Sequence, residues 1–369
     1  MLKRVIIKGF KSIKTMDLEL RPLNILIGAN GAGKSNLISF FKMLNEMMAG
    51  RLQQYIGISG YAQSLLHFGP KVTPQIEAQL EFKIDNGSVY IIYTICLLHA
   101  AGDTLIFAEE TGTRNGSHLP QPSTTYSFGA GQQETKINKA AQAGTPTIAN
   151  TIKHLLNLCR VYHFHDTSST ARVRQSCYID DNHSLVSDAG NLAALLLRFR
   201  EDYNIAYQRI IKTIRLIAPF FDDFVLEPRG NNVILNWREK GSESNQVFGP
   251  HQFSDGTLRA ICLTTLLLQP ENELPELIIV DEPELGLHPY ALNIVAGMFG
   301  KASYHTQILI STQSTSFLDN FNPEDVITVD RVGKESQFKR LNPEELESWL
   351  EEYSLGEIWE KNIIGGGPH

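Results

Sequence analysis

This chain of 369 residues has few cysteines, no long apolar run and no excess of basic residues. Its four cysteines are scattered and form no C-x-x-C pair, a usage typical of reduced thiols in a cytoplasmic protein. No stretch approaches the roughly 20 apolar residues of a transmembrane helix, and residues 5–7 are too short an apolar run for a signal peptide. The sequence therefore predicts a cytoplasmic protein without a membrane partner.

The sequence also lacks internal repeats and heptads, so the chain cannot build a long coiled coil. Its net charge of −7 does not indicate the global basic field of a nucleic-acid-binding protein. One local stretch, Lys3–Lys14, is basic and contains no acidic residue. Three interpretations of it stay open: a solvated strand face, contact of Lys11 or Ser12 with nucleotide phosphate, or contact with an acidic polymer such as DNA.

What the chain does contain is Gly28–Ser35, which fits the phosphate-binding pattern G-x-x-x-x-G-K-[ST]. The short apolar run Asn24–Ile27 precedes it, and residues 35–48 carry apolar side chains at helical spacing. This strand, glycine loop and helix are the context that a P-loop requires, and they disfavour an incidental glycine-rich turn. Glycines let backbone N–H groups face a polyphosphate, and the helix N-terminus adds partial positive charge.

Lys34 is expected to reach the β- and γ-phosphates of ATP, and the Ser35 hydroxyl is expected to ligate Mg²⁺. The residues predicted to bind the nucleotide in this loop are Asn30, Gly31, Ala32, Gly33, Lys34, Ser35 and Asn36.

The regions around the P-loop differ in pattern. Strands are predicted at residues 2–9, 16–20, 75–84 and 88–98, the last two joined by a turn at Asp85-Asn86-Gly87, and at 103–109. Residues 111–146 are rich in Gly, Ser, Thr, Gln and Pro and predict an exposed, mobile insertion. Helices are expected at 148–158, 191–199 and 205–217, with a strand pair at 224–226 and 233–237. The acidic segment 343–360 predicts a solvated helical surface.

Polar residues follow several apolar strands. Asp281 and Glu282 end the run Leu277–Val280, Gln313 follows the strand Gln307–Ile310, and His165-Asp166 follows residues 160–164. Because ligands lie beyond the carboxyl ends of parallel strands, these groups are expected to meet the P-loop at one site. Asp281 can hold Mg²⁺ directly or through water, and Glu282 is the best-placed general base for water attack on the γ-phosphate.

These motifs, in this order, resemble the ABC-type ATPases. The branch most similar is that of stand-alone RecF/SMC-like ATPases, which are grouped with the AAA family and are related to the ATPase domain of OLD-family proteins. The resemblance rests on "VIIKGFKSIK", "LNILIGANGAGKSNLI", "FSDGTLRAICL", "LIIVDEPELGLHP", "ILISTQS" and "SLGEIWEKNIIGGG". It implies an α/β fold: a P-loop NTPase of the ABC-ATPase-like head type, with a mainly parallel core sheet, an antiparallel β lobe and a helical lobe.

The resemblance also implies one ATPase head over residues 1–369. Within it we expect five regions: the P-loop and N-terminal strands (1–50), the β lobe with the insertion (75–147), the helical lobe and strand pair (148–245), the signature, Walker B and switch region (246–330), and a C-terminal strand and acidic tail (331–369).

Such ATPases sandwich two ATP molecules between two heads, which implies a homodimer or higher oligomer. Ser254, Asp255 and Gly256, the signature residues here, would then cap the γ-phosphate held by the P-loop of the other head. The family pattern assigns catalytic roles to Lys34, Ser254, Glu282 and Gln313, and Mg²⁺ to Ser35 and Asp281.

The sequence departs from the family pattern in three ways. Asp255 replaces a glycine common in the signature, Gln313 replaces the usual switch histidine, and no clear Q-loop glutamine is present, with His165 or Asp166 as stand-ins. A metal at His163 and His165 is disfavoured, since His-x-His on a strand usually packs or forms hydrogen bonds. Fewer than sixty residues follow Gln313, so we expect no intrinsic nuclease domain of the kind that OLD-family proteins carry.

The sequence thus predicts an ATPase that uses ATP and Mg²⁺. By family analogy, it would act as a sensor or regulator in DNA maintenance or anti-phage defence, with a separate effector such as a nuclease or toxin, and with DNA as a further partner. The alternative is a nucleotide-gated scaffold with negligible hydrolysis that holds a toxin, nuclease or DNA.

Overall fold

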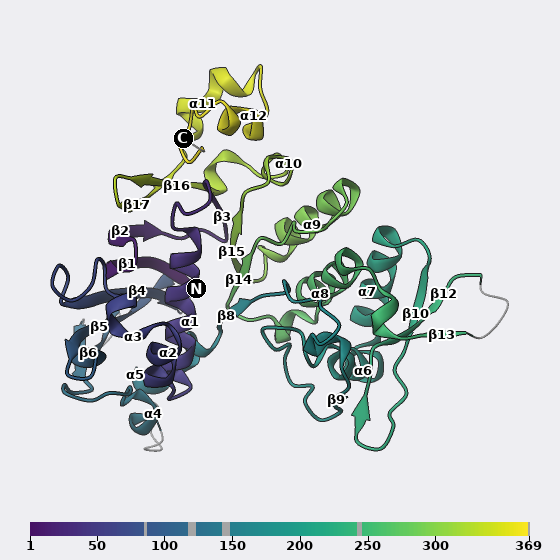
Figure 1. Cartoon of the computed structure of the whole chain (residues 1–369), viewed down its shortest axis with the longest axis horizontal. Coiled ribbons are helices and arrows are strands. Elements are labelled where there is room, and N and C mark those ends of the chain that lie inside the picture. The colour runs from purple at the N-terminus through teal and green to yellow at the C-terminus, as the bar shows by residue number, and fades with distance from the viewer. Residues whose placement is uncertain (85–86, 117–122, 142–147, 242–245, 368–369) are drawn as a thin grey trace.

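The computed structural model describes residues 1–84, 87–116, 123–141, 148–241 and 246–367. Two six-stranded sheets and a group of helices make up most of this part of the chain (Figure 1). The mainly parallel sheet has the strand order β17-β16-β3-β15-β14-β8, and only β17 runs antiparallel to its neighbour. Its strands are β3 (Leu23–Ile27), β8 (Cys159–Tyr162), β14 (Leu277–Asp281), β15 (Gln307–Thr312), β16 (Val326–Val332) and β17 (Glu335–Arg340).

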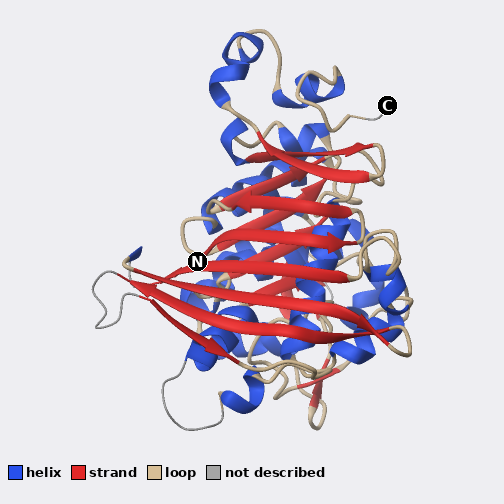
Figure 2. Cartoon of the chain, turned by 90° about the vertical axis from the view of Figure 1, so that its left-hand side faces the viewer, coloured by secondary structure: helices blue, strands red, loops and turns tan. Residues whose placement is uncertain are grey.

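The second sheet is antiparallel throughout, in the order β2-β1-β4-β5-β6-β7, and Figure 2 shows its outer face. Its strands are β1 (Leu2–Phe10), β2 (Ile13–Glu19), β4 (Gln75–Ile84), β5 (Val89–Ala100), β6 (Thr104–Gly116) and β7 (Ser123–Ser127). The alternating burial of β4 and β5 explains their strand-type sequence pattern. The parallel core sheet and the antiparallel β lobe confirm the α/β fold class expected from the sequence.

Helix α1 (Lys34–Met48) lies between the two sheets and is buried on most of its surface. Alternate residues of the central strands face opposite layers: Ile279 and Leu309 pack with α1, whereas Ile278 and Ile308 pack with the helical lobe. This two-sided burial explains the continuous apolar runs of β14 and β15. Four smaller helices border this layer: α2 (Leu52–Ile58), α3 (Tyr61–Leu65), α4 (Ile137–Ala140) and α5 (Ile148–Asn157).

The helical lobe covers the other face of the parallel sheet and lies on the right in Figure 1. Its helices are α6 (Leu192–Asp202), α7 (Asn204–Ile217), α8 (Asp255–Leu268) and α9 (Pro289–Ala302), and its short strands are β9 (Cys177–Tyr178), β10 (Phe221–Val225), β11 (Asn232–Val233), β12 (Asn236–Glu239) and β13 (Val247–Phe248). Trp237 of β12 stacks on Phe253, with ring centroids 4.6 Å apart, and so fixes the segment that leads into α8.

Two sequence predictions need correction. The composition of residues 111–146 predicts an exposed, mobile insertion. Most of its described residues are indeed not buried, but the segment has regular structure: residues 111–116 continue β6, β7 pairs with β6, and α4 buries Ile137. Residues 117–122 and 142–146 of that prediction lie outside the described residues, as do Asp85 and Asn86 of the expected turn. Cross-strand pairing overrides the weak local propensity of this segment.

Only the first half of the acidic segment 343–360 forms the expected solvated helical surface. Helix α11 (Pro343–Leu350) buries Leu346 alone, as expected, but α12 (Leu355–Glu360) buries Leu355, Ile358 and Trp359. These three residues have helical spacing, so α12 is amphipathic and packs on α10 (Thr315–Leu318) in the same core cluster. Counting acidic residues over the whole segment conceals this apolar face.

The basic N-terminal stretch is largely neutralised within the fold. Lys3 pairs with Glu19, Arg4 with Asp17, Lys8 with Glu77 and Lys14 with Glu335, all across adjacent strands. These pairs favour the solvated strand face among the three interpretations of this stretch. Within the described ranges, no helix is long and apolar enough to cross a membrane.

Candidate functional site

The P-loop connects β3 to α1, as its pattern predicts. Gly31 and Gly33 have φ angles of 79° and 120°, in the region that favours glycine. A Cβ on Gly33 would lie 2.0 Å from the Ser336 Oγ and 2.9 Å from the Ser12 Oγ, so no larger residue fits there. The loop is therefore shaped by its own glycines and by two serines from β17 and the β1–β2 turn.

Lys34, the first residue of α1, is almost completely buried, with 5% of its surface exposed. Its Nζ donates to the Gly28 carbonyl and, at 3.2 Å, to the Ala29 carbonyl. Burial lowers the pKa of the Lys34 ammonium, and the carboxylates of Glu282 and Asp281 oppose that shift. An ammonium removed from water in this way gains most when a polyphosphate supplies the missing negative charge.

Asp281 is the last residue of β14 and pairs with Ser311 of β15, the strand that lies between β14 and the P-loop strand β3. Burial raises the pKa of its carboxyl, and the neighbouring Glu282 charge adds to the rise. Its Oδ1 is buried without a hydrogen-bond partner. A buried oxygen without a hydrogen-bond partner fits a bound cation, and the Ser35 hydroxyl, which lines the P-loop cleft, is the second group that would hold Mg²⁺.

Glu282 and Gln313 contact each other directly. The Gln313 Nε2 donates to the Glu282 Oε1, and the Glu282 N–H donates to the Ser311 carbonyl at 2.7 Å. Glu282 also has a φ of 43°, a left-handed conformation that is uncommon for a non-glycine residue. Strain of this kind is typical of functional positions.

Glu284 supports the same region, although no sequence pattern assigns it a role. Its Oε1 accepts from the Thr312 Oγ1 at 2.6 Å and from the Gln313 N–H at 3.1 Å. Burial raises the pKa of the Glu284 carboxyl. The switch residue Gln313 is therefore held by its backbone to Glu284 and by its side chain to Glu282.

These groups surround one cleft of about 190 Å³. It brings Glu282 and Gln313 together with most of the P-loop, and it is lined by Ala29, Asn30, Gly31, Gly33, Lys34, Ser35, Asn36, Glu282, Gln313 and Arg331. A second cleft of about 750 Å³ shares Asn36 and Arg331 with the first and contains the basic side chains of Lys11, Lys71 and Lys334. Ala32, which belongs to the P-loop, is buried and does not line the cleft, and neither does Asp281, whose carboxyl interacts electrostatically with the neighbouring Glu282.

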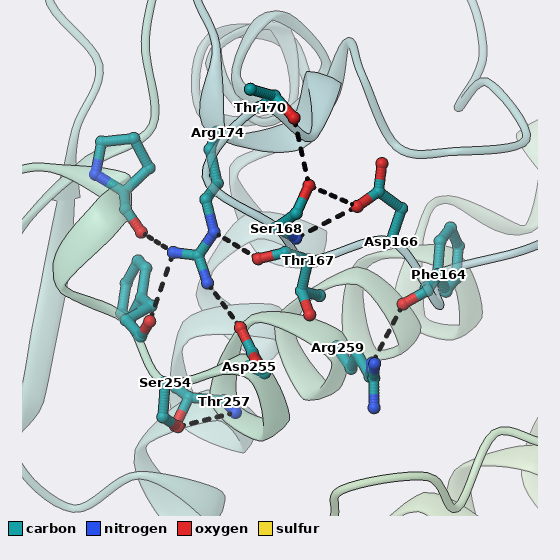
Figure 3. Close-up of polar contacts among 12 residues, drawn as sticks. Phe164, Asp166, Thr167, Ser168, Thr170, Arg174, Ser254, Asp255, Thr257 and Arg259 are labelled. Carbon is teal, nitrogen blue, oxygen red and sulfur yellow. Dashed lines mark hydrogen bonds and ion pairs between the residues drawn. The ribbon is translucent and has the colours of Figure 1, made fainter.

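The signature residues lie elsewhere. Ser254, Asp255 and Gly256 are not among the described residues that line the P-loop cleft. Ser254 is the N-cap of α8, where its Oγ accepts from the Thr257 N–H at 3.2 Å. The Asp255 carboxylate turns toward Arg174, whose Nη2 lies 2.8 Å from Oδ1 (Figure 3). Arg174 thus neutralises the carboxylate that makes this signature atypical.

Gly256 is packed tightly. A Cβ on this residue would lie 2.1 Å from the carbonyl oxygen of Gly286, in the segment that follows the Walker B residues. Arg259, one turn further along α8, donates to the Leu285 carbonyl at 2.9 Å and to the His165 carbonyl at 2.8 Å. The start of α8 is therefore tied to the Walker B loop and to the segment after β8.

His165 and Asp166 separate in the structure. The His165 Nε2 lies 2.8 Å from the Asp281 carbonyl oxygen, next to the site, whereas Asp166 accepts from the N–H and Oγ of Ser168 in an exposed turn. Burial, with Lys42 and His165 nearby, lowers the pKa of His163 to about 4. Within the described ranges no three His, Cys, Asp or Glu side chains form a group that could hold a metal ion.

Sequence reasoning missed Arg331 and Arg174. Arg331, at the end of β16, donates to the Gly31 carbonyl at 3.1 Å and lines both clefts. Arg174 donates to the carbonyls of Thr167, Pro250 and Phe253 as well as to Asp255. Neither arginine belongs to a local pattern, and each reaches a motif that is distant in sequence.

The chain is similar to known ATPase heads. Residues 23–319 match the family described as "AAA domain, putative AbiEii toxin, Type IV TA system". The fold is similar to an SMC head bound to the C-winged helix domain of ScpA (TM-score 0.59, 15% identity, covering 94% of this chain and 99% of that one). It is also similar to an SMC head with an extended coiled coil, bound to the C-terminal domain of ScpA from Pyrococcus furiosus (TM-score 0.55, 14% identity, 95% and 99%).

No curated protein matches the sequence. The family match covers the P-loop, the signature, the Walker B strand and the switch, and the structural matches show an SMC-head-like fold over nearly the whole chain. The chain belongs to this AAA domain family of P-loop ATPases.

Proposed function

We propose that this chain is an ATPase head that binds ATP and Mg²⁺, dimerises around two nucleotides and hydrolyses them. One observation carries the proposal: Lys34, Glu282 and Gln313 converge on a single cleft beside an unpaired buried oxygen of Asp281. A cation, a general base and a hydrogen-bond donor at the carboxyl ends of parallel strands are the parts that phosphoryl transfer needs.

In this proposal Lys34 and the N–H groups of the P-loop hold the β- and γ-phosphates. Glu282 accepts a hydrogen bond from the attacking water, and Gln313 fixes the carboxylate through its Nε2. Ser35 and Asp281 would hold Mg²⁺, which neutralises the charge that develops on the phosphate oxygens. The α-phosphate, ribose and base would extend into the adjoining 750 Å³ cleft, where Lys11 and Arg331 offer positive charge to the α-phosphate.

The exposed position of Ser254 supports a role in trans. Ser254 lies at the N-terminus of an α-helix of 14 residues, where N–H groups and the helix dipole favour an anion. Since the Asp255 carboxylate is paired with Arg174, it does not offset that preference. A second copy of the chain would bring this helix terminus to the γ-phosphate on the first, and a single head would lack it.

The proposed biological role is that of a sensor or regulator of a separate effector, such as a nuclease or toxin, in DNA maintenance or anti-phage defence. The description of the matched family supports a link to toxin systems, and the SMC heads similar in fold were solved with fragments of a partner, ScpA. The ion pairs along β1 and β2 disfavour that surface as a DNA contact. Co-purification from the native host would identify the effector.

The rival proposal is a nucleotide-gated scaffold with negligible hydrolysis. Gln313 favours it, because glutamine donates a hydrogen bond but cannot titrate. Asp255 does not favour the scaffold, since Arg174 compensates the charge of its carboxylate. Steady-state phosphate release with and without DNA separates the two proposals: turnover supports the ATPase, and tight ATP binding without turnover supports the scaffold.

Nucleotide binding itself is tested by calorimetry with ATP and Mg²⁺. We expect binding by the wild-type chain, and Lys34→Ala should abolish it because an ammonium no longer faces the phosphates. Lys301→Ala, which removes an exposed lysine from the end of α9, is the matched control and should bind normally. A wild-type chain that ignores ATP would remove the basis of both proposals.

A further inference from the structure

The segment 354–367, which we name the tail segment, contacts the P-loop and also α10, the helix that follows the switch residue Gln313. It contains α12 and a run of three glycines, Gly365–Gly367. In Figure 1 it lies beside α10 and above β16. None of the proposed nucleotide-binding or catalytic residues belongs to it, yet its contacts fall directly on the P-loop and next to the switch.

The first contact is with the P-loop. The Ala29 N–H donates to the Gly366 carbonyl at 2.7 Å, and the Gly366 N–H donates to the Asp330 Oδ1 at 2.5 Å. A chain of two hydrogen bonds therefore runs from β16 through the tail segment to the loop that is proposed to hold phosphate. Arg331, the residue after Asp330, donates to the Gly31 carbonyl, so the end of β16 reaches the same loop from a second direction.

Two of the three glycines are required by this arrangement. Gly365 and Gly366 have φ angles of 75° and 74°, which favour glycine. A Cβ on Gly365 would lie 2.5 Å from the Asp330 Oδ2, and one on Gly366 would lie 3.2 Å from the Trp359 Nε1 and 3.3 Å from the Ile27 carbonyl oxygen. At Gly366 the positive φ is the stronger reason for glycine, since a Cβ there would require its neighbours to shift by only a few tenths of an ångström.

The second contact is with α10, which begins two residues after the switch residue Gln313. The Gly356 N–H donates to the Asp319 Oδ1 at 2.7 Å, and a Cβ on Gly356 would lie 2.8 Å from the Thr315 carbonyl oxygen. Ile358 of α12 is fully buried in the same apolar cluster as Phe317 of α10. The two short helices are thus locked together by a hydrogen bond, a close backbone approach and a shared core.

We propose that the tail segment positions the P-loop relative to the switch, through the Ala29–Gly366 hydrogen bond at one end and the α12–α10 packing at the other. This inference rests on the proposed ATPase function, because it assigns the tail segment to that same site. It follows that loosening the P-loop end should weaken nucleotide binding, whereas loosening the α10 end should slow turnover without weakening binding.

Asp330→Ala tests the P-loop end, because it removes the acceptor that holds Gly366. We expect a roughly 5- to 10-fold weaker Kd for ATP and Mg²⁺, and a similar rise in the hydrogen-exchange rate of the peptide that contains Ala29. Asp330→Asn retains an oxygen acceptor and should restore both quantities. In Asp330→Ala the exchange of peptides far from the P-loop should stay unchanged, which a general loss of stability would not allow. Glu360→Gln, an exposed change on α12, is the matched control.

Asp319→Ala tests the α10 end and should lower kcat by about 5-fold or more with an unchanged Kd. Exchange and affinity within about twofold of wild type in Asp330→Ala would overturn the inference, and so would equal losses in Asp330→Asn. A wild-type chain that fails to bind ATP would instead overturn the proposed function. The exchange rate of Ala29 would then still report whether the tail segment holds the loop.

Discussion

The guanidinium of Arg174 and the carboxylate of Asp255 lie 2.8 Å apart, and they differ sharply in exposure. The Arg174 side chain is 5% exposed, whereas that of Asp255 is 65% exposed. The exposed Asp255 carboxylate is therefore paired with a buried arginine, whose guanidinium also donates to three backbone carbonyls. This relationship explains how a signature segment can carry an aspartate where an anion is expected to bind.

The Arg174–Asp255 pair is tested by a double-mutant cycle. Arg174→Ala removes the arginine donor from the carbonyls of Thr167, Pro250 and Phe253, of which Pro250 keeps the Phe253 N–H, so we expect the free energy of unfolding to fall by about 2–3 kcal/mol, measured in urea. ATP-dependent dimerisation should weaken as well, because Asp255 then faces phosphate unpaired. Adding Asp255→Gly should restore dimerisation in ultracentrifugation but not the lost stability. If dimerisation stays weak in the double variant, the carboxylate charge is not the cause.

Glu282→Gln should trap the ATP-bound dimer. The substitution keeps the size of the side chain but removes the base, and positioned bases contribute roughly 10²- to 10⁴-fold to rate. We expect phosphate release to fall by about that factor while ATP binding is retained, and light scattering should show a dimer that persists with ATP. Glu347→Gln on the exposed face of α11 is the control. Unchanged turnover would remove Glu282 from its assigned role.

The contact between Gln313 and Glu282 predicts an order of activities. Gln313→Leu deletes the donor that fixes the Glu282 carboxylate and should lower kcat about 10-fold, with little effect on the Kd for ATP. Gln313→Glu places a second carboxylate beside Glu282 and should lower kcat further. Single-turnover kinetics measure the chemical step directly. A variant with leucine that turns over as fast as wild type would show that this hydrogen bond has no part in catalysis.

The same residues show how far the sequence predicts the site. Lys34, Asp281 and Glu282 belong to short runs whose backbone geometry is encoded locally, so their patterns are sufficient to place them at strand ends. Arg174 lies 81 positions from Asp255, and Arg331 lies 300 from Gly31. Such contacts depend on how lobes pack, which no local pattern of one sequence encodes.

The prediction for the tail segment is wrong for a different reason. The apolar spacing of Leu355, Ile358 and Trp359 is visible in the sequence and predicts a buried helix face. The acidic composition of the surrounding segment conceals it. The helical spacing of apolar residues is the stronger indicator of burial here, because a buried helix face needs only one or two apolar residues per turn while the other positions remain charged.

The His163 side chain predicts a pH dependence of stability. Its pKa is about 4 in the folded protein against an ordinary value of 6.5, so the folded state disfavours the charged imidazole. Stability from this group is present above pH 6.5 and is lost as pH falls from there through about 4. After allowance for partial exposure, we expect a loss on the order of 1–2 kcal/mol.

His163→Asn should remove that part of the pH dependence, so its stability relative to wild type should improve as the pH falls from 6.5 to about 4. Urea unfolding across this range measures the difference. His183→Asn, a change of an exposed histidine, controls for the loss of an imidazole as such. Parallel pH profiles for wild type and His163→Asn would contradict the assignment.

The close approach of Gly256 to Gly286 provides a test of the signature segment that leaves the P-loop unchanged. In Gly256→Ala the new methyl group would lie 2.1 Å from a backbone carbonyl oxygen, so the start of α8 must move away from the Walker B loop. Because Gly256 is proposed to act on the nucleotide of the other head, binding of ATP to a single head should be unaffected. Dimerisation and turnover should fall about 10-fold or more.

Gly297→Ala in α9 is the matched control, since a Cβ there meets nothing within 4 Å and alanine favours a helix by about 1 kcal/mol. It should stabilise the protein and leave turnover intact. Calorimetry gives the affinity of each variant, and phosphate release over a range of protein concentrations gives the contribution of the dimer. If Gly256→Ala dimerised and turned over like wild type, the signature segment would have no part in the proposed composite site, which would have to be abandoned.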